Sequence, residues 1–117
     1  MRVIGLIPSR LNSTRLPSKA LLMIDGLPLV VHTMKRAQLA EVLDEVYVCT
    51  DSEKIGQAVE EHDGKFIMTR SEHVNGTERI AEAAKKMKAD FIVDIQGDEP
   101  LVDPAHIDTV VREHSRQ

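Results

Sequence analysis

Two kinds of hydrophobic pattern alternate along the chain. Short apolar runs rich in β-branched residues predict buried strands at residues 2–7, 45–50, 65–68 and 91–95. Amphipathic segments predict helices at residues 28–40, 78–88 and 104–114, with another between a cap at Asp51 or Ser52 and a stop at Gly64. Strand and helix therefore alternate throughout. This order predicts an α/β fold with three αβα layers, in which a mostly parallel sheet carries helices on both faces.

Turn and capping residues mark the boundaries of these elements. Pro8 is expected to end the first strand, and Asp25-Gly26 to close a short strand within ALLMI, residues 20–24. Pro28 suits the first turn of the helix that follows. The inward face of that helix is expected to hold Val30, Val31, Met34 and Ala37. The third helix should bury Ile80, Ala84 and Met87, with Glu82 and Lys86 paired outside.

The composition, 42% hydrophobic over 117 residues, is that of an ordinary globular domain without repeats or linkers. No apolar run approaches the roughly 18 residues that span a bilayer, and the N-terminal run is too short for a signal peptide. Cys49 is the only cysteine, which suggests a reducing compartment. We therefore expect a cytoplasmic protein without a membrane partner. The last element is a helix with no closing strand, so we expect a sheet that is incomplete at its C-terminal end.

Charge is unevenly distributed along the chain. Residues 1–40 carry six Lys and Arg against one Asp, a balance of +5, whereas the whole chain has a net charge of -4. The rest of the chain therefore carries -9. A basic front on an acidic protein argues against nonspecific nucleic-acid binding, which favours a net basic face. It suits a localised site for a small polyanion.

The strongest basic feature is the segment PSRLNSTRLPSK, residues 8–19, directly after the first strand. It is neither a Walker loop nor a G-x-G-x-x-G turn, so its side chains rather than its backbone would supply the charge. Arg15 and Lys19 can converge on a polyphosphate, Arg as a planar clamp and Lys as a point charge. A solvated basic loop without a ligand is the alternative.

Two further segments follow later strands and should meet the first, because parallel strands present their carboxyl ends at one edge, where ligands bind. QGDEP, residues 96–100, offers Asp98 and Glu99 as Mg²⁺ ligands, or forms only a turn. TRSEHVNGTER, residues 69–79, brings a helix N-terminus that suits a ligand oxygen, or is a plain helix cap. His73 within it is either an acid–base group or a surface residue.

These three segments resemble a known family. PSRLNSTRLPSKAL is similar to the signature of the sugar-acid cytidylyltransferases. MTRSEHVNGTERIAEA and VDIQGDEPLV resemble those members that activate 3-deoxy-manno-octulosonate (KDO) for lipopolysaccharide synthesis. The resemblance runs along essentially the whole chain. It implies a Rossmann-like nucleotidyltransferase sheet, with residues 1–117 as a single nucleotide-binding domain or the N-terminal half of a nucleotidyltransferase domain.

The resemblance implies Mg²⁺-dependent transfer of CMP from CTP to the anomeric hydroxyl of KDO, with release of pyrophosphate. Residues matching Arg10, Arg15 and Lys19 would handle the triphosphate as the catalytic set. Nucleotide contacts would come from Ser9, Arg70, Gly76, Thr77 and Gln96, and the magnesium ligand would be Asp98. Glu78 and Arg79 belong to the same motif without an assigned role. Full-length relatives would be homodimers.

The chain departs from the family in two ways. Ser18 stands where the family has glycine, which matters if that position requires a positive φ or a close phosphate. The family's chains are about twice as long, and their second half supplies a further metal carboxylate, most sugar contacts and the dimer interface.

Other functions remain open at this point. The chain could bind CTP without transferring it, or serve another sugar acid or another nucleotide. A receiver-like signalling domain, phosphorylated on Asp51, has a similar size and order of elements, but it requires acidic residues where this chain has Pro8-Ser9-Arg10.

Overall fold

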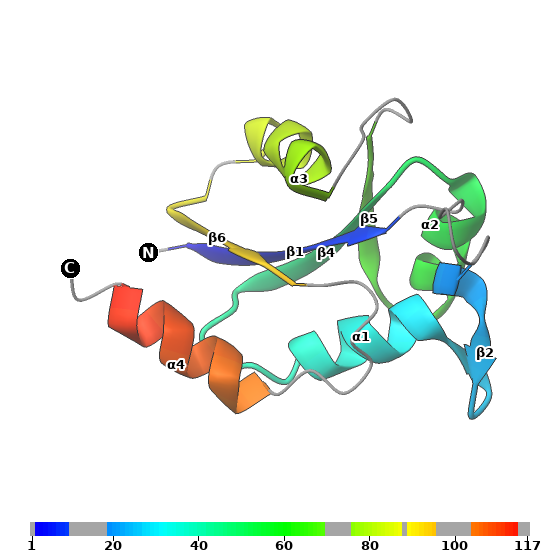
Figure 1. The fold of residues 1–117 in the computed structure, drawn as a ribbon, viewed down its shortest axis with the longest axis horizontal. Helices are drawn as coiled ribbons and strands as arrows, with labels where there is room; N and C mark the ends of the chain where they lie inside the picture. The colour runs from blue at the N-terminus through cyan, green and yellow to red at the C-terminus, as the bar shows by residue number, and fades with distance from the viewer. Residues whose placement is uncertain (1, 10–18, 70–75, 88, 96–103, 115–117) are drawn as a thin grey trace.

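A four-stranded parallel sheet forms the centre of the molecule, in the order β5-β4-β1-β6 (Figure 1). The strands are β1 (Val3–Ser9), β4 (Glu45–Thr50), β5 (Lys65–Met68) and β6 (Phe91–Asp94). The computed structural model describes residues 2–9, 19–69, 76–87, 89–95 and 104–114. The three strand pairings of this sheet are parallel, as the alternation of elements predicted.

Helices cover both faces of this sheet, which confirms the predicted three-layer fold (Figure 1). One face packs against α1 (Leu29–Ala37), α2 (Glu53–Glu61) and α4 (Pro104–His114), and the other against α3 (Gly76–Lys85). The chain moves outward from β1 to β4 and β5, then returns to the far side of β1 as β6. Crossovers of constant hand must change face when the direction reverses, which places α3 opposite α1 and α2.

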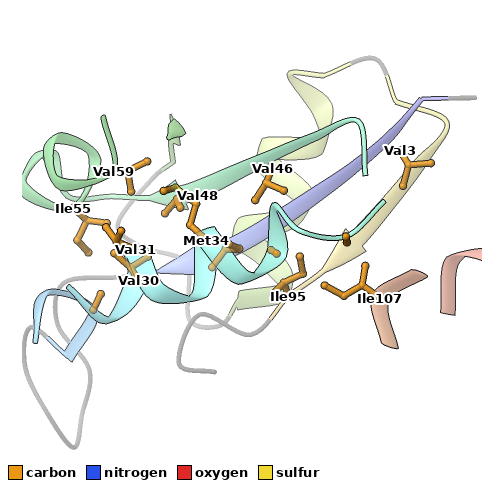
Figure 2. Packing of buried hydrophobic residues seen from close by; sticks show 14 of the residues in the cluster. Val3, Val30, Val31, Met34, Val46, Val48, Ile55, Val59, Ile95 and Ile107 are labelled. Atoms are coloured by element: carbon orange, nitrogen blue, oxygen red, sulfur yellow. The ribbon is translucent and has the colours of Figure 1, made fainter. Parts of the chain in front are cut away.

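The larger of two hydrophobic clusters lies between the sheet and α1, α2 and α4 (Figure 2). The predicted inward face of α1 is buried throughout, at Val30, Val31, Met34 and Ala37. In Figure 2, Val30, Val31 and Met34 lie under Val46 and Val48 of β4, while Ile107 of α4 approaches Ile95. Burial of this apolar face, at about 25 cal/mol per Å², is what holds a short helix such as α1 in place.

The smaller cluster fills the face under α3. Its buried members are Ile4, Leu6, Cys49 and Ala83, and the predicted inward residues Ile80, Ala84 and Met87 pack against it. The Glu82 and Lys86 side chains pair on the outside at 3.3 Å, again as predicted.

The prediction that Pro8 ends the first strand was wrong, because β1 continues through Ser9. The amide of Ile95 donates to the Leu6 carbonyl, so Leu6 and, two residues on, Pro8 turn their backbone groups towards β6. The ladder between β1 and β6 ends where Leu6 pairs with Asp94. Pro8 lacks an N–H, but the β1–β6 ladder has ended before Pro8, so the proline costs this ladder no hydrogen bond.

The segment before α1 forms a small hairpin rather than one strand. A single turn of 3-10 helix, η1 (Lys19–Leu21), leads into β2 (Met23–Ile24) and β3 (Leu27–Pro28). Asp25 and Gly26 between them have φ values of 49° and 84°. Two successive positive φ angles indicate a type I′ turn, which is the turn that Asp-Gly favours in hairpins.

Several predicted boundaries shift by a few residues. Pro28 precedes α1 as its cap, and α1 ends at Ala37 rather than residue 40. Ser52, not Asp51, caps α2, since its hydroxyl accepts from the Ile55 amide at 3.3 Å. At the other end of α2, the left-handed residue is Asp63, with φ 63°, and not Gly64.

α3 begins at Gly76, two residues before its predicted start, and β6 is half-buried instead of fully buried. In the parts of the chain that the structure describes, no helix is long and apolar enough to cross a membrane.

Candidate functional site

The carboxyl edge of the sheet is the candidate site. Ser9 at the end of β1 pairs in register with Thr50 at the end of β4, and Thr50 pairs with Met68 at the end of β5. On the other side of β1, β6 ends at Asp94, which pairs with Leu6, three residues before the end of β1. The segments after β1 and β6 therefore leave the sheet from neighbouring strands, as expected for ligand-binding loops of a parallel sheet.

Part of the predicted site lies within the described structure. Ser9 is buried, with 8% of its surface exposed, at the last position of β1. Lys19 is the first residue of η1, and Ala20 in the same turn is buried in the larger hydrophobic cluster. Gly76 and Thr77 are the first two residues of α3. The other predicted site residues, Arg10, Arg15, Arg70, Gln96 and Asp98, lie outside the described residues, as do Ser18 and His73.

A buried guanidinium is the strongest polar feature at this edge. Arg79, in the first turn of α3, has 2% of its surface exposed. Its Nη1 donates to Thr69 Oγ1 at 2.5 Å, and its Nη2 lies 3.8 Å from Asp51 Oδ2. Thr69 follows β5 and Asp51 follows β4. One side chain thus ties the start of α3 to the ends of two strands.

Hydrogen bonds continue from this cluster across the strand ends. The Thr69 amide donates to the Thr50 carbonyl at 2.9 Å, and the Ser52 amide donates to Thr50 Oγ1 at 3.1 Å. Thr50 is fully buried. Asp51 Oδ1 is also buried and has no hydrogen-bond partner among the described residues. This corner of the site is therefore rigidly connected, with one carboxylate oxygen still able to accept.

Sequence reasoning left Arg79 without a role and treated Asp51 only as a cap or a phosphorylation site. The signal for Arg79 was its place within the GTER motif, on the inward side of a helix otherwise marked by Ile80 and Ala83. No local pattern identifies Thr69 and Asp51 as its partners, because only the folded sheet brings them together.

Two ionisable groups near this edge have pKa values raised by burial. The thiol of Cys49, fully buried in β4, has its pKa raised to about 12 by burial, although the nearby Arg79 charge opposes the shift. Burial also raises the pKa of the Asp94 carboxyl at the end of β6. A thiol so placed is a poor nucleophile at neutral pH, so we assign Cys49 to the core and not to chemistry.

The described residues fit the metal requirement only indirectly. Among them, no group of three His, Cys, Asp or Glu side chains could hold a metal ion. Mg²⁺ commonly takes one or two protein carboxylates and completes its shell with phosphate oxygens and waters. The strands that precede the predicted carboxylate ligand and the predicted phosphate segment, β6 and β1, are neighbours in the sheet.

Of the surface hollows lined by described residues, one lies beside α2 and β5 and another lies at the amino ends of β4 and β5. The larger, of about 620 Å³, runs along the outer side of α2 and β5 and is lined by Glu53, Gln57, Glu60, Glu61, Phe66 and Met68. Three carboxylates and no cation in this lining would repel a polyphosphate. The hollow is therefore not the nucleotide site.

The strand order also separates this fold from the receiver-like alternative. Numbered along the chain, the parallel strands have the order 3-2-1-4. The flavodoxin-like arrangement of receiver domains has the order 2-1-3-4-5. The first strand here ends in Ser9, without an acidic cluster.

Comparisons with known proteins point to one family. A family model described as cytidylyltransferase matches residues 4–117. A 3-deoxy-manno-octulosonate cytidylyltransferase of Pelobacter propionicus is 46% identical over 112 residues, covering 96% of this chain and 44% of that protein. An 8-amino-3,8-dideoxy-manno-octulosonate cytidylyltransferase of Shewanella sp. (strain W3-18-1) is 42% identical, covering 100% of this chain and 49% of that protein.

Solved structures give the same result. A CMP:2-keto-3-deoxy-manno-octonic acid synthetase complexed with CTP superimposes with a TM-score of 0.97 at 38% identity, over 100% of this chain and 48% of that one. The chain spans about half the length of the curated relatives it matches. The sequence match over residues 4–117, together with this fold, shows that the chain belongs to the cytidylyltransferase family.

Proposed function

We propose that this chain forms the CTP-binding part of a cytidylyltransferase that transfers CMP from CTP to the anomeric hydroxyl of a KDO-class sugar acid and releases pyrophosphate. The observation that carries the proposal is its superposition on a CTP-complexed synthetase with a TM-score of 0.97 at 38% identity. At that identity, the similarity extends to sequence as well as fold. The three motifs that suggested the family all follow the carboxyl ends of parallel strands.

The chemistry suits a site made of cations and positioned backbone groups. Nucleotidyl transfer requires an in-line approach and neutralised charge, but little covalent participation by the protein. We assign the triphosphate to Arg10, Arg15 and Lys19, with Arg15 and Lys19 on the leaving pyrophosphate. The nucleoside contacts are assigned to Ser9, Arg70, Gly76, Thr77 and Gln96.

Asp98 is proposed as the ligand of Mg²⁺, since it follows β6 in the sequence, and β6 is the neighbour of β1, the strand before the basic segment. Mg²⁺, when bound, would supply positive charge next to the α-phosphate and the pyrophosphate. Removing Mg²⁺ with a chelator is expected to weaken CTP binding, because the phosphates would then face only the protein's cations.

Two octulosonates are candidates for the sugar acid. Relatives named for KDO and for 8-amino-3,8-dideoxy-manno-octulosonate match this chain at 46% and 42% identity. These identities are too close to separate the two sugars. The shared feature is an eight-carbon keto sugar acid, so both sugars belong in the assay.

The decisive test is pyrophosphate release by this chain with CTP and Mg²⁺, with each octulosonate, with sialic acid, and without sugar. Release with one octulosonate alone would support the proposal and name the substrate. Arg15→Ala and Asp98→Asn should abolish it, while Lys35→Ala, which removes an exposed lysine of α1, should not. Equal release with sialic acid would contradict the sugar assignment.

A second function is favoured by one observation, the coverage of only 44–49% of the curated relatives. The residues present could bind CTP without transferring it. In that case CTP would raise the melting temperature in a Mg²⁺-dependent way, and no pyrophosphate would appear with any sugar.

A further inference from the structure

The inference concerns Arg79, whose charge is buried although it lies at the edge where substrate would bind. With 2% of its surface exposed, its guanidinium has lost most of its hydration. Such a charge is strongly unfavourable unless it is paired and hydrogen-bonded. Thr69 Oγ1 and Asp51 Oδ2 supply that pairing at 2.5 and 3.8 Å. The contacts therefore fix the side chain in one geometry.

The two residues that contact Arg79 follow different strands, so the contacts connect α3 to two strand ends. Asp51 follows β4, and Thr69 follows β5, where its amide also bonds to Thr50 at 2.9 Å. Arg79 itself lies within the first turn of α3, three residues after Gly76. The guanidinium therefore locks the N-terminal turn of α3 onto the carboxyl edge of the sheet.

We propose that Arg79 is a positioning residue, which with Asp51 and Thr69 holds the backbone at Gly76 and Thr77 in the place that binds the nucleotide. This inference rests on the proposed CTP site. It assigns no substrate contact to Arg79, which acts through the turn it anchors. A site held in advance by packed supporting residues loses less freedom when its ligand binds, and small displacements of such a site weaken binding strongly.

The geometry requires an arginine. Nη1 and Nη2 reach two acceptors at once, and a lysine, with a single ammonium, keeps the charge without that fork. Arg79→Lys therefore tests geometry apart from charge. Thr69→Val removes the acceptor but keeps the shape, and Thr69→Ser restores a hydroxyl. Arg112→Lys on α4 is the matched control, because Arg112 pairs with Glu41 at 3.3 Å on the surface.

The first measurement is amide hydrogen exchange at residues 80–82, whose amides bond to the carbonyls of residues 76–78 in the first turn of α3, without nucleotide and at a temperature where each variant is fully folded. Arg79→Lys and Thr69→Val should speed exchange there relative to the strands of the sheet, whereas Thr69→Ser and Arg112→Lys should not. Equal protection in all variants would overturn the proposal. This measurement does not depend on the proposed function.

The second measurement is the CTP dissociation constant of the same variants. Loss of a residue that orients metal ligands typically costs roughly ten- to a hundredfold in affinity, and we expect a loss of the same order in CTP affinity for Arg79→Lys and Thr69→Val. Wild-type affinity in both would overturn the inference while leaving the CTP site intact. Absence of CTP binding by the wild-type chain would instead contradict the proposed function, and hydrogen exchange would then decide the role of Arg79.

Discussion

Cys49 gives a test of how tightly the candidate site is built. Its thiol lies in β4, one residue before Thr50, and is fully buried beneath α3. Burial raises its pKa from 9.0 to about 12. At pH 8, about one-tenth of a thiol with the ordinary pKa is thiolate, against about one part in ten thousand for Cys49.

Reaction of native Cys49 with a maleimide should therefore be at least about a thousandfold slower than that of an accessible thiol, from ionisation alone. Exclusion of the reagent from the core slows it further. The comparison is a Cys49→Ser/Lys35→Cys variant, whose thiol would occupy an exposed position of α1. Labelling is followed by mass spectrometry at several pH values.

Labelling that does occur must pass through opening of the sheet, so low concentrations of urea should accelerate it. A ligand that binds only the closed form should slow it, by about a hundredfold when its concentration is 100 times its Kd. A native Cys49 that reacts within tenfold of the control thiol would refute both the burial of β4 and the raised pKa.

Three other predictions concern stability. Gly64→Ala should lower the free energy of unfolding by about 1–3 kcal/mol or more, because the new methyl group would overlap Met34. Gly26→Ala, in open space with φ 84°, should lower it by about 1 kcal/mol from backbone strain alone. Urea unfolding of both variants measures the difference. Ser52→Ala should remove the α2 cap and about 1 kcal/mol, and Ser52→Thr should retain most of it. Hydrogen bonds from Arg2 and then Tyr47 lower the pKa of Glu45 from 4.5 to about 2, so its contribution is complete above pH 4.5 and is lost as the pH falls through about 2. Glu45→Gln should therefore reduce the dependence of the melting temperature on pH between about pH 2 and pH 4.5. An unchanged pH dependence would contradict this role of Glu45.

The sequence predicted helices and strands well where apolar residues recur at a helical spacing or form short continuous runs. The buried face of α1 and the bounds of β4 and β5 came directly from apolar spacing. The end of β1 was predicted wrongly at Pro8, because the effect of a proline depends on the neighbouring strand. A proline disrupts a strand only where a partner strand needs its N–H, and β6 has already ended at that position. Likewise Gly64 suggested a helix stop, but it is required by the close approach of Met34, and Asp63 takes the left-handed turn.

The candidate site also has a part that the sequence predicted and a part that it did not. The strand ends that precede its three motifs were predictable, because parallel strands present their carboxyl ends at one edge of the sheet. The pairing of Arg79 with Thr69 and Asp51 was not, since each residue alone has an ordinary local role. Thr69 resembles a loop residue and Asp51 a cap, and only the register of β4 with β5 brings them to one guanidinium.

The central claim is that the carboxyl edge of this sheet binds CTP. Calorimetric titration of the 117-residue chain with CTP, UTP and GTP, each with and without Mg²⁺, tests it most directly. We expect saturable binding of one CTP per chain that weakens without Mg²⁺, with UTP and GTP binding much more weakly. No saturable binding of CTP, or equal binding of all three nucleotides, would contradict it.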